Sequence, residues 1–277
     1  MKKFTLIGHP LGHSMSPFIH SELFKISGVD GEYDCTDLKP ENFSEEVKKL
    51  KMLNGYNVTI PYKRDIMPYM DELDETAKRY GAVNCVFNDG NKSIGYNTDC
   101  TGFLMSCASL PLSGKVLLIG CGGVGRMMAL EAALHKADLT IGIIPEASKA
   151  AAALSEEIYT KAPGSRVHIQ DVESVSGVFD LIINASPVGM YPNTDACPVS
   201  LELIGLCSSV FDAVYNPIET KFIQTAKSFG KTAINGTSML VYQAVKAHEI
   251  WNGSKFSDED VRKLINKTNE LIAEDFK

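Results

Sequence analysis

The sequence has no long hydrophobic run and no excess of positive charge. No stretch approaches the ~18 consecutive apolar residues that a membrane-spanning helix needs. A net charge of −7 at pH 7 argues against a nucleic-acid-binding surface, on which Lys and Arg would cluster. Gly8, His9 and Pro10 interrupt the first apolar stretch before it reaches the ~7–15 residues of a signal-peptide core. We therefore interpret this stretch as a strand and expect neither membrane nor nucleic acid as a partner.

Cysteine motifs are also missing. The seven cysteines form no C-x-x-C pair and no Cys/His cluster with the spacing of a zinc site. Scattered thiols in odd number are typical of a reducing compartment, so we expect a cytoplasmic protein with free thiols and no metal. The 277 residues, 44% of them hydrophobic, are enough for one large or two ordinary domains.

Short apolar runs alternate with helical patterns along most of the chain, which is typical of an α/β fold with a parallel or mixed sheet. Several of these runs are almost continuously apolar, as in strands that are buried on both faces. We expect strands at 3–7, 116–119, 139–141 and 181–183, and a helix at 17–26. After Asn235 and Gly236 only helical patterns remain, so the last helices must pack on an earlier part of the chain.

A glycine-rich segment at 120–125, G-C-G-G-V-G, follows one of these strands and opens a helical pattern. It matches G-x-G-x-x-G, in which Gly120 makes the tight turn, Gly122 lets the backbone approach a pyrophosphate and Gly125 lets helix and strand pack closely. The helix N-terminus favours the phosphate anion. The strand–loop–helix context favours a dinucleotide site over a plain glycine turn. The predicted cofactor-binding residues are Gly120, Gly122, Gly123, Val124 and Gly125.

Seven further motifs follow one another along the whole chain. They are G-H-P-L-G-H-S-M-S-P at 8–17, N-V-T-I-P-Y-K at 57–63, G-A-V-N at 81–84, N-T-D at 97–99, N-A-S-P-V-G-M at 184–190, D-A-V-Y-N-P at 212–217 and N-G-T-S-M-L-V-Y-Q at 235–243. Each motif alone is a modest signal. In this order and spacing, the chain resembles the shikimate dehydrogenase family, which has quinate/shikimate dehydrogenases as close relatives.

The resemblance implies two domains. An N-terminal α/β substrate-binding domain would comprise 1–101 and be completed by the C-terminal helices at 236–277. A Rossmann-like NAD(P)-binding domain would comprise 102–235. The implied activity is the interconversion of 3-dehydroshikimate and shikimate, a small-molecule reaction of aromatic amino acid biosynthesis, by a monomer or homodimer.

The resemblance assigns the acid–base chemistry to Lys63, with Asp99 as its partner. A ketone that receives hydride becomes an oxyanion, which needs a positioned proton donor. The alternative is a solvated lysine after a Pro-Tyr turn, with Asp99 as the N-cap of the next helix.

Other motif positions correspond to the family's substrate contacts. Ser14, Ser16 and Tyr215 would bind the carboxylate, although Ser16 before Pro17 also reads as a helix N-cap. Amide and hydroxyl groups would read the ring hydroxyls, because amides offer donor and acceptor together. These residues are Asn57, Thr59, Asn84 and Gln243. For Gln243, in an apolar helical pattern, a structural hydrogen bond is the competing interpretation.

The sequence departs from the family at one point. NADP-using members carry Asn-Arg-Thr after the second strand of the nucleotide domain, and this chain has no arginine there. Glu146 stands where an NAD-type acid would lie, and Lys149 could supply a weaker phosphate contact. The resemblance thus implies NADP, with NAD a serious alternative, and it also places Gly236 at the cofactor. A third interpretation is a catalytically silent relative that binds a dinucleotide. The retention of Lys63 and Asp99 argues against it.

Overall fold

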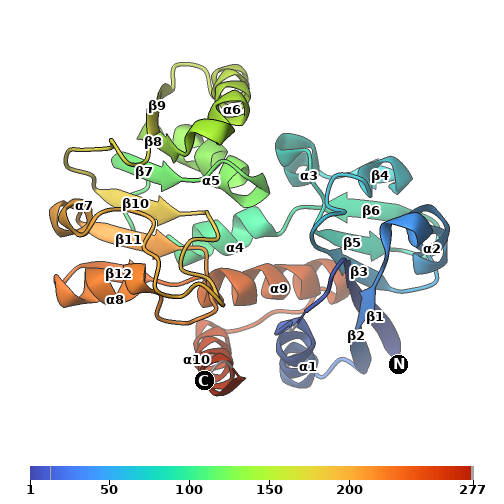
Figure 1. Cartoon of the computed structure of the whole chain (residues 1–277). Coiled ribbons are helices and arrows are strands. Elements are labelled where there is room, and N and C mark those ends of the chain that lie inside the picture. Colours follow the sequence, from blue (N-terminus) through green and yellow to red (C-terminus); the bar gives the residue numbers. More distant parts are fainter. Residues whose placement is uncertain (13, 276–277) are drawn as a thin grey trace. The chain divides into compact units, whose positions relative to one another are not determined.

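The computed structural model describes residues 1–12 and 14–275, and it has a mixed α/β fold with two sheets (Figure 1). The α/β class expected from the alternating pattern is confirmed. The chain divides into two compact units. The first unit consists of Met1–Gly102 and Leu240–Thr268, and the second of Phe103–Met239 and the residues from Asn269 onward. We describe each unit by itself.

The first unit contains a mixed six-stranded sheet in the order β2-β1-β3-β5-β6-β4. Its strands are β1 (Lys2–Gly8), β2 (Gly31–Asp37), β3 (Gly55–Val58), β4 (Glu72–Leu73), β5 (Cys85–Asn88) and β6 (Ser93–Tyr96). β1 runs parallel to β2 and β3, whereas β5 runs antiparallel to β3 and β6. The strand expected at 3–7 is β1 and is confirmed.

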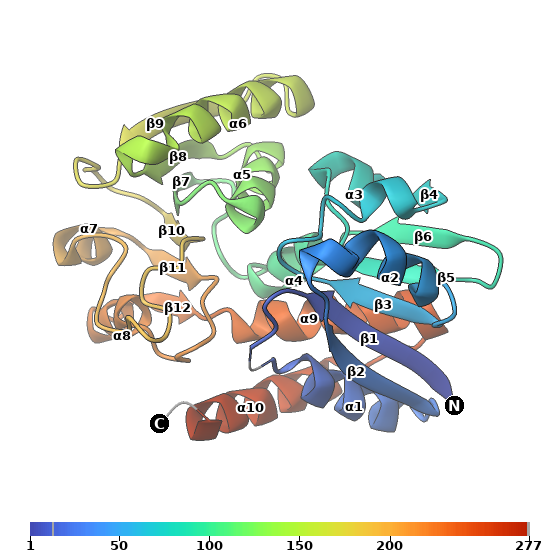
Figure 2. The same cartoon turned by 45° about the vertical axis from the view of Figure 1, so that its right-hand side comes forward.

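Helices cover both faces of this sheet (Figure 2). They are α1 (Ser16–Ser27), α2 (Phe43–Leu50), α3 (Glu75–Tyr80) and α9 (Thr237–Asn252), with short 3-10 turns η1 (Pro40–Asn42) and η2 (Met67–Tyr69). Alternate residues of β1 point to opposite faces, as a strand requires. Ile7 joins a cluster with Val47 of α2, and Phe4 joins another with Trp251 of α9. The expectation that a late helix packs on an earlier sheet is therefore confirmed for α9.

The second unit contains a six-stranded sheet in which every pairing is parallel. Its strands are β7 (Lys115–Ile119), β8 (Asp138–Ile143), β9 (Arg166–Asp171), β10 (Leu181–Asn184), β11 (Ser209–Asp212) and β12 (Thr232–Ile234). The three strands expected within this region are β7, β8 and β10. The order β12-β11-β10-β7-β8-β9 reverses between β7 and β10. In doubly wound sheets, ligands bind outside the carboxyl ends of the strands at such a reversal.

Helices also belong to the second unit. They are α5 (Gly123–Leu134), α6 (Ser148–Lys161), α7 (Leu201–Leu206) and α8 (Lys221–Ser228), with a 3-10 turn η3 (Pro145–Ala147). Two more helices, α4 (Asp99–Ser106) and α10 (Asp258–Asp275), begin in the first unit and end in the second. α7 and α8 pack on one face of the second sheet through a cluster that includes Leu203, Val210 and Phe222. α5 is tied to α6 by Arg126, which forms two hydrogen bonds to Glu157, one of them 2.6 Å from Nε to Oε2.

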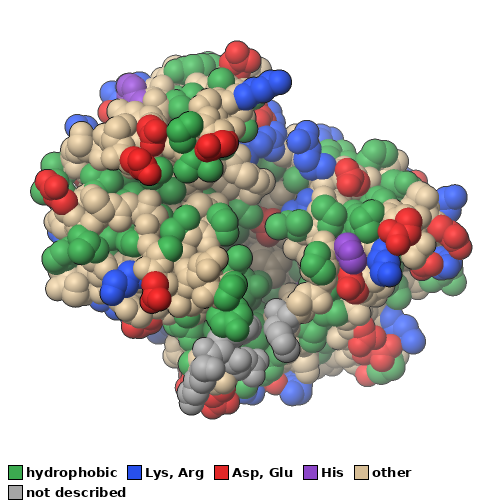
Figure 3. Space-filling model, in the orientation of Figure 1, with side chains coloured by type: hydrophobic (Ala, Val, Ile, Leu, Met, Phe, Trp, Pro, Cys, Tyr) green, Lys and Arg blue, Asp and Glu red, His purple; other side chains and the backbone are tan. Residues whose placement is uncertain are grey.

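Among the described residues, no helix is both long and apolar enough to cross a membrane. In the same part of the chain, no three His, Cys, Asp or Glu side chains gather where they could hold a metal ion. All seven cysteines are free thiols. On the face drawn in Figure 3, acidic and basic side chains are interspersed.

Candidate active site

Lys63 and Asp99 meet in the first unit, although 36 positions separate them in the sequence. The Lys63 Nζ donates to Asp99 Oδ2 over 2.7 Å. The two side chains are 23% and 15% exposed, so solvent reaches the pair but does not surround it. An ammonium in this position can deliver a proton to a substrate oxygen, and the adjacent carboxylate holds it in place.

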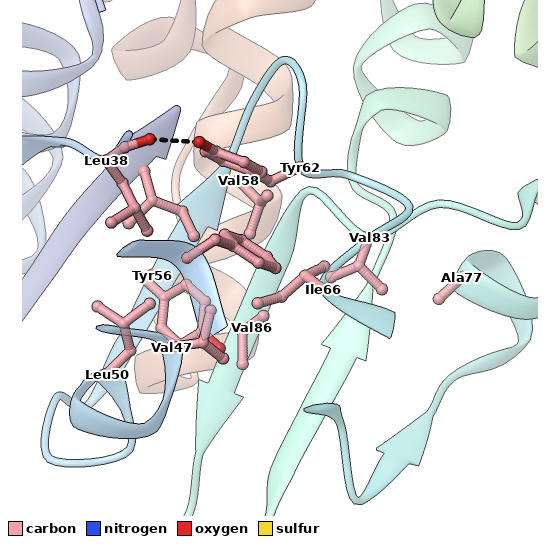
Figure 4. Packing of buried hydrophobic residues seen from close by; sticks show 12 residues of the cluster. Leu38, Val47, Leu50, Tyr56, Val58, Tyr62, Ile66, Ala77, Val83 and Val86 are labelled. Atoms are coloured by element: carbon pink, nitrogen blue, oxygen red, sulfur yellow. Dashed lines mark hydrogen bonds between the residues drawn. The ribbon is translucent and has the colours of Figure 1, made fainter. Parts of the chain in front are cut away.

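The segment before Lys63 is anchored in the hydrophobic core. Val58 and Tyr62 point into the same cluster, and the Tyr62 hydroxyl donates to the Leu38 carbonyl (Figure 4). Ile60 between them is 73% exposed and takes no part in this packing. The Lys63 carbonyl accepts a 2.7 Å hydrogen bond from the Val83 amide. The main chain of Lys63 is thus fixed on both sides, which leaves only its side chain to be oriented.

Asp99 is oriented by Asn84. The Asn84 Nδ2 donates to Asp99 Oδ1 over 2.8 Å, and its Oδ1 accepts from the Thr98 amide over 2.6 Å. Asn84 is only 3% exposed, so these bonds hold its amide in one orientation. Asp99 is also the first residue of α4, where the helix dipole stabilises a carboxylate. Each carboxylate oxygen therefore has a defined donor.

Three other residues of this unit are predicted to bind the ring hydroxyl groups, and each lies in a different environment. Asn57 is 5% exposed, and its Nδ2 donates to the Asn84 carbonyl over 3.0 Å. Thr59 is partly buried beside Gly8, where an added Cβ would lie 2.5 Å from Thr59 Cγ2. Gln243 Nε2 donates to Leu240 O over 2.8 Å within α9. The structural hydrogen bond considered for Gln243 is therefore present.

The two serines lie at the start of α1. The helix begins at Ser16 with Met15 at the N-cap, and the hydroxyl of Ser14 accepts a 3.2 Å hydrogen bond from the Ser16 amide. The interpretation of Ser16 as the N-cap is therefore wrong, because the helix starts one residue earlier than that reading requires. Ser16 is buried and Ser14 is partly buried.

The glycine loop lies at the reversal between β7 and β10 in the second unit. Gly120 has φ +93°, a left-handed conformation that side chains disfavour, and a Cβ there would lie 3.2 Å from Ala185 O. A Cβ on Gly125 would lie 2.4 Å from Gly120 O, so only glycine permits this approach of helix to strand. A Cβ on Gly122 or Gly123 would meet nothing within 4 Å. The loop thus fits a pyrophosphate at the N-terminus of α5.

A buried carboxylate, Asp212, joins two of the family-like motifs in this unit. It accepts hydrogen bonds from Asn184 Nδ2 at 2.9 Å, the Val214 amide at 3.0 Å and Thr220 Oγ1 at 2.5 Å. Burial raises its pKa to about 6, and the three donors partly oppose this shift. Sequence reasoning assigned no role to Asp212. Its only advance signal was its place in D-A-V-Y-N-P, because the pairing with Asn184 depends on the β10–β11 register.

Tyr215 follows Asp212 by three residues in the chain, and Gly236 packs against the main chain between them. Tyr215 is partly buried, and burial raises the pKa of its phenol. The Gly236 amide donates to Val214 O over 3.2 Å, and a Cβ on Gly236 would lie 2.3 Å from Ala213 O. Close backbone packing therefore explains the glycine at 236.

The positions considered for a 2′-phosphate follow β8. Glu146 lies in η3 and Lys149 in the first turn of α6, and both side chains are exposed. Ser148 Oγ donates to Pro145 O over 2.5 Å, which stabilises this turn. The arginine nearest in sequence to the glycine loop, Arg126, is engaged with Glu157.

Comparison with known proteins gives a consistent result. A model of the shikimate dehydrogenase substrate binding domain matches residues 6–86. The chain is 40% identical to "Shikimate dehydrogenase (NADP(+))" of Methanococcus maripaludis strain C7 over 277 residues, which cover 98% of each protein.

Solved structures of similar proteins extend the comparison. The shikimate 5-dehydrogenase of Thermus thermophilus, solved with NADP(H) and shikimate, has a TM-score of 0.84 at 29% identity, covering 97% of this chain and 100% of that one. The Listeria monocytogenes enzyme, solved with shikimate and NAD, has a TM-score of 0.85 at 28% identity, covering 95% and 96% of the two chains. The chain therefore belongs to the shikimate dehydrogenase family.

Proposed function

We propose that the protein is an oxidoreductase that interconverts 3-dehydroshikimate and shikimate by hydride transfer with a nicotinamide cofactor. The observation that carries this proposal is the 2.7 Å contact between Lys63 and Asp99, within motifs that match the family. A protein that only bound a dinucleotide would have no use for such a pair. The full-length similarity to enzymes named for this reaction supports the same conclusion.

The chemistry requires one hydride and one proton. When bound, the nicotinamide ring supplies the hydride to the ketone carbon, or accepts it in the reverse direction. As the carbonyl oxygen gains charge, the Lys63 ammonium donates a proton to it, and in shikimate oxidation the neutral amine takes that proton back. Asp99 keeps Nζ in place and balances its charge.

The binding roles that we propose are those that the family resemblance implies. Ser14, Ser16 and Tyr215 would hold the carboxylate, because hydroxyl hydrogen bonds to a charged group are the stronger kind. Asn57, Thr59, Asn84 and Gln243 would contact or support the ring hydroxyls. Gly120, Gly122, Gly123, Val124 and Gly125 would bind the pyrophosphate, and Gly236 would also contact the cofactor. The proposed substrate domain comprises 1–101 and 236–277, and the cofactor domain comprises 102–235.

The cofactor we propose is NADP, as in the names of the relatives, with weak discrimination against NAD. A 2′-phosphate normally meets arginine, whose planar fork binds it with two hydrogen bonds. Here the turn after β8 offers Lys149 and the acidic Glu146 instead. This observation also favours a second candidate, an NAD-dependent enzyme that accepts quinate as well as shikimate.

The test is the appearance of reduced cofactor, followed by its absorbance in the near ultraviolet, with shikimate or quinate as substrate and NADP⁺ or NAD⁺ as oxidant. We expect shikimate oxidation with NADP⁺ and a smaller rate with NAD⁺. A larger kcat/KM for quinate with NAD⁺ would establish the second candidate. No reduction with any of these combinations would contradict both.

A further inference from the structure

The one buried side chain of β2 is Tyr33. Its hydroxyl donates to Asn57 Oδ1 over 2.8 Å, and Asn57 Nδ2 in turn donates to the Asn84 carbonyl over 3.0 Å. Asn84 then donates to the carboxylate of Asp99. Tyr33, which no family-like motif includes, is therefore linked through Asn57 to the main chain of Asn84, the residue whose side chain orients Asp99.

Tyr33 is itself held in place by a second polar group. Its ring stacks on the His20 ring with centroids 3.9 Å apart and planes 6° from parallel. His20 Nδ1 lies 3.0 Å from His248 Nε2, which joins α1 to α9 beneath the tyrosine. Burial lowers the pKa of both imidazoles, that of His248 to about 3, so the stack carries no charge near neutral pH. Ser16 also acts as a hydrogen-bonding neighbour of the Tyr33 phenol.

The direction of the Tyr33–Asn57 bond has a chemical consequence. An asparagine side chain has an accepting end and a donating end, and its orientation is set by its partners. The Asn84 carbonyl can only accept, so it takes Nδ2 of Asn57 and leaves Oδ1 to accept from the Tyr33 hydroxyl. Without the hydroxyl, one of the two restraints on this amide disappears.

We propose that Tyr33 is a positioning residue that fixes the Asn57 amide and thereby sets the enzyme's discrimination between ring hydroxyl groups. This inference rests on the proposed function, in which Asn57 serves hydroxyl recognition. Tyr33 touches neither the reacting atoms nor Lys63, so its effect falls on substrate affinity and hydroxyl selectivity, whereas the chemical step is spared.

The variant Tyr33→Phe removes only the hydroxyl and keeps the ring on His20. The matched control is Tyr56→Phe. Tyr56 is 1% exposed and adjacent to Asn57 on β3, but its side chain points into the cluster on the other face of the sheet. Any general effect of losing a buried phenol appears in both variants, whereas loss of the Asn57 restraint appears only in the first.

The measurement is kcat and KM for shikimate and for two analogues that each lack one non-reacting ring hydroxyl, with melting curves for every variant. We expect Tyr33→Phe to raise KM for shikimate by about 3- to 10-fold, the effect of one neutral hydrogen bond, with kcat within about threefold of the wild type. Its preference for shikimate over one analogue falls by a similar factor. In the Asn57→Ala background, adding Tyr33→Phe changes KM by less than about twofold, because the group through which it acts is gone.

Three results would overturn the proposal. These are an unchanged KM and selectivity in Tyr33→Phe, an equal effect in Tyr56→Phe, or a full Tyr33→Phe effect in the Asn57→Ala background. If Tyr33→Phe fails to fold, Asn57→Asp tests the residue through which Tyr33 is proposed to act, because its carboxylate still accepts from Tyr33 but cannot donate to Asn84 O. Selectivity retained in Asn57→Asp contradicts the proposal. A wild-type enzyme that neither oxidises nor binds shikimate overturns the proposed function and this inference together, whereas an active wild type isolates failure to the Tyr33 link.

Discussion

The candidate sites of the two units are formed by different chemical groups. In the first unit the functional groups are side chains held by other side chains, with Lys63 bonded to Asp99 and Asp99 to Asn84. In the second, the candidate phosphate site is main chain, shaped by the absence of Cβ atoms at Gly120 and Gly125. The first site should therefore fail when a charge or donor is removed, and the second when a single methyl group is added.

After the loss of Lys63 itself, the largest effect we expect comes from Asp99→Asn in the first unit. The substitution keeps the shape but removes the charge that holds the Lys63 ammonium, so kcat should fall by about 10²- to 10³-fold, close to the range for losing a general acid. Steady-state kinetics with shikimate measures this. Asp74→Asn is the control, because the Asp74 carboxylate caps α3 and accepts from the Ala77 amide and the Thr76 hydroxyl. Equal losses in the two variants would mean that the effect is structural.

In the second unit, the buried Asp212 predicts a pH-dependent stability. Its pKa is raised to about 6 in the folded protein, so the folded state binds the proton more tightly than the unfolded chain does. This contribution is fully present below the unfolded pKa of about 3.9 and is lost as the pH rises through the folded value, a difference of about 2–3 kcal/mol.

Asp212→Asn removes this titration while an amide oxygen can still accept from Asn184. The melting temperature of the wild type relative to Asp212→Asn should therefore be higher at about pH 4.5 than at about pH 7.5, measured in buffers of matched ionic strength. A difference that is constant across this range, or larger at high pH, would contradict the assignment of a raised pKa to Asp212.

Adding a single methyl group should lower the stability of the protein at Gly125 but not at Gly123. In Gly125→Ala the new Cβ would lie 2.4 Å from Gly120 O, which forces the backbone apart and should destabilise the unit by about 1–3 kcal/mol. In Gly123→Ala the Cβ meets nothing within 4 Å, and alanine favours a helix, so stability should be kept or increased. Denaturant unfolding compares the two. If both glycines tolerate alanine equally, the close approach is not what requires glycine at 125.

The smallest effect concerns the turn after β8. Lys149 is an exposed cation, and exposed ion pairs contribute about 0.2–1 kcal/mol, so Lys149→Ala should raise KM for NADP⁺ by about 1.5- to 5-fold. KM for NAD⁺, which lacks the phosphate, should stay unchanged. A parallel rise for both cofactors would place Lys149 outside the 2′-phosphate site.

Sequence alone was most informative where local chemistry is decisive. The glycine loop could be placed from its motif, and the structure accounts for two of its glycines, because Gly120 and Gly125 each meet a local backbone requirement. The buried strands β7, β8 and β10 were visible as apolar runs. The pairing of Lys63 with Asp99 came only from the family resemblance, since nothing in a 36-residue separation indicates contact.

The remaining features depend on tertiary register. Tyr33 reaches Asn57 because β2 and β3 both flank β1, and Asp212 reaches Asn184 because β10 and β11 pair residue for residue. No periodicity in the sequence encodes either contact. The start of α1 was misjudged because the local signal is ambiguous, since Ser14 and Ser16 are both good capping residues. Only the backbone conformation shows that Ser14 supplies the accepting hydroxyl.

The most direct test of the account is the kcat of Lys63→Ala at saturating shikimate and cofactor, with the dissociation constant of NADP⁺ measured on the same preparation. The comparison of the two units predicts that kcat falls by about 10²- to 10⁴-fold, because the proton donor is lost. It also predicts that NADP⁺ binding stays within about threefold of the wild type, because a main-chain site does not depend on that side chain. A kcat within about threefold of the wild type would contradict the assignment of Lys63 as the catalytic acid and base.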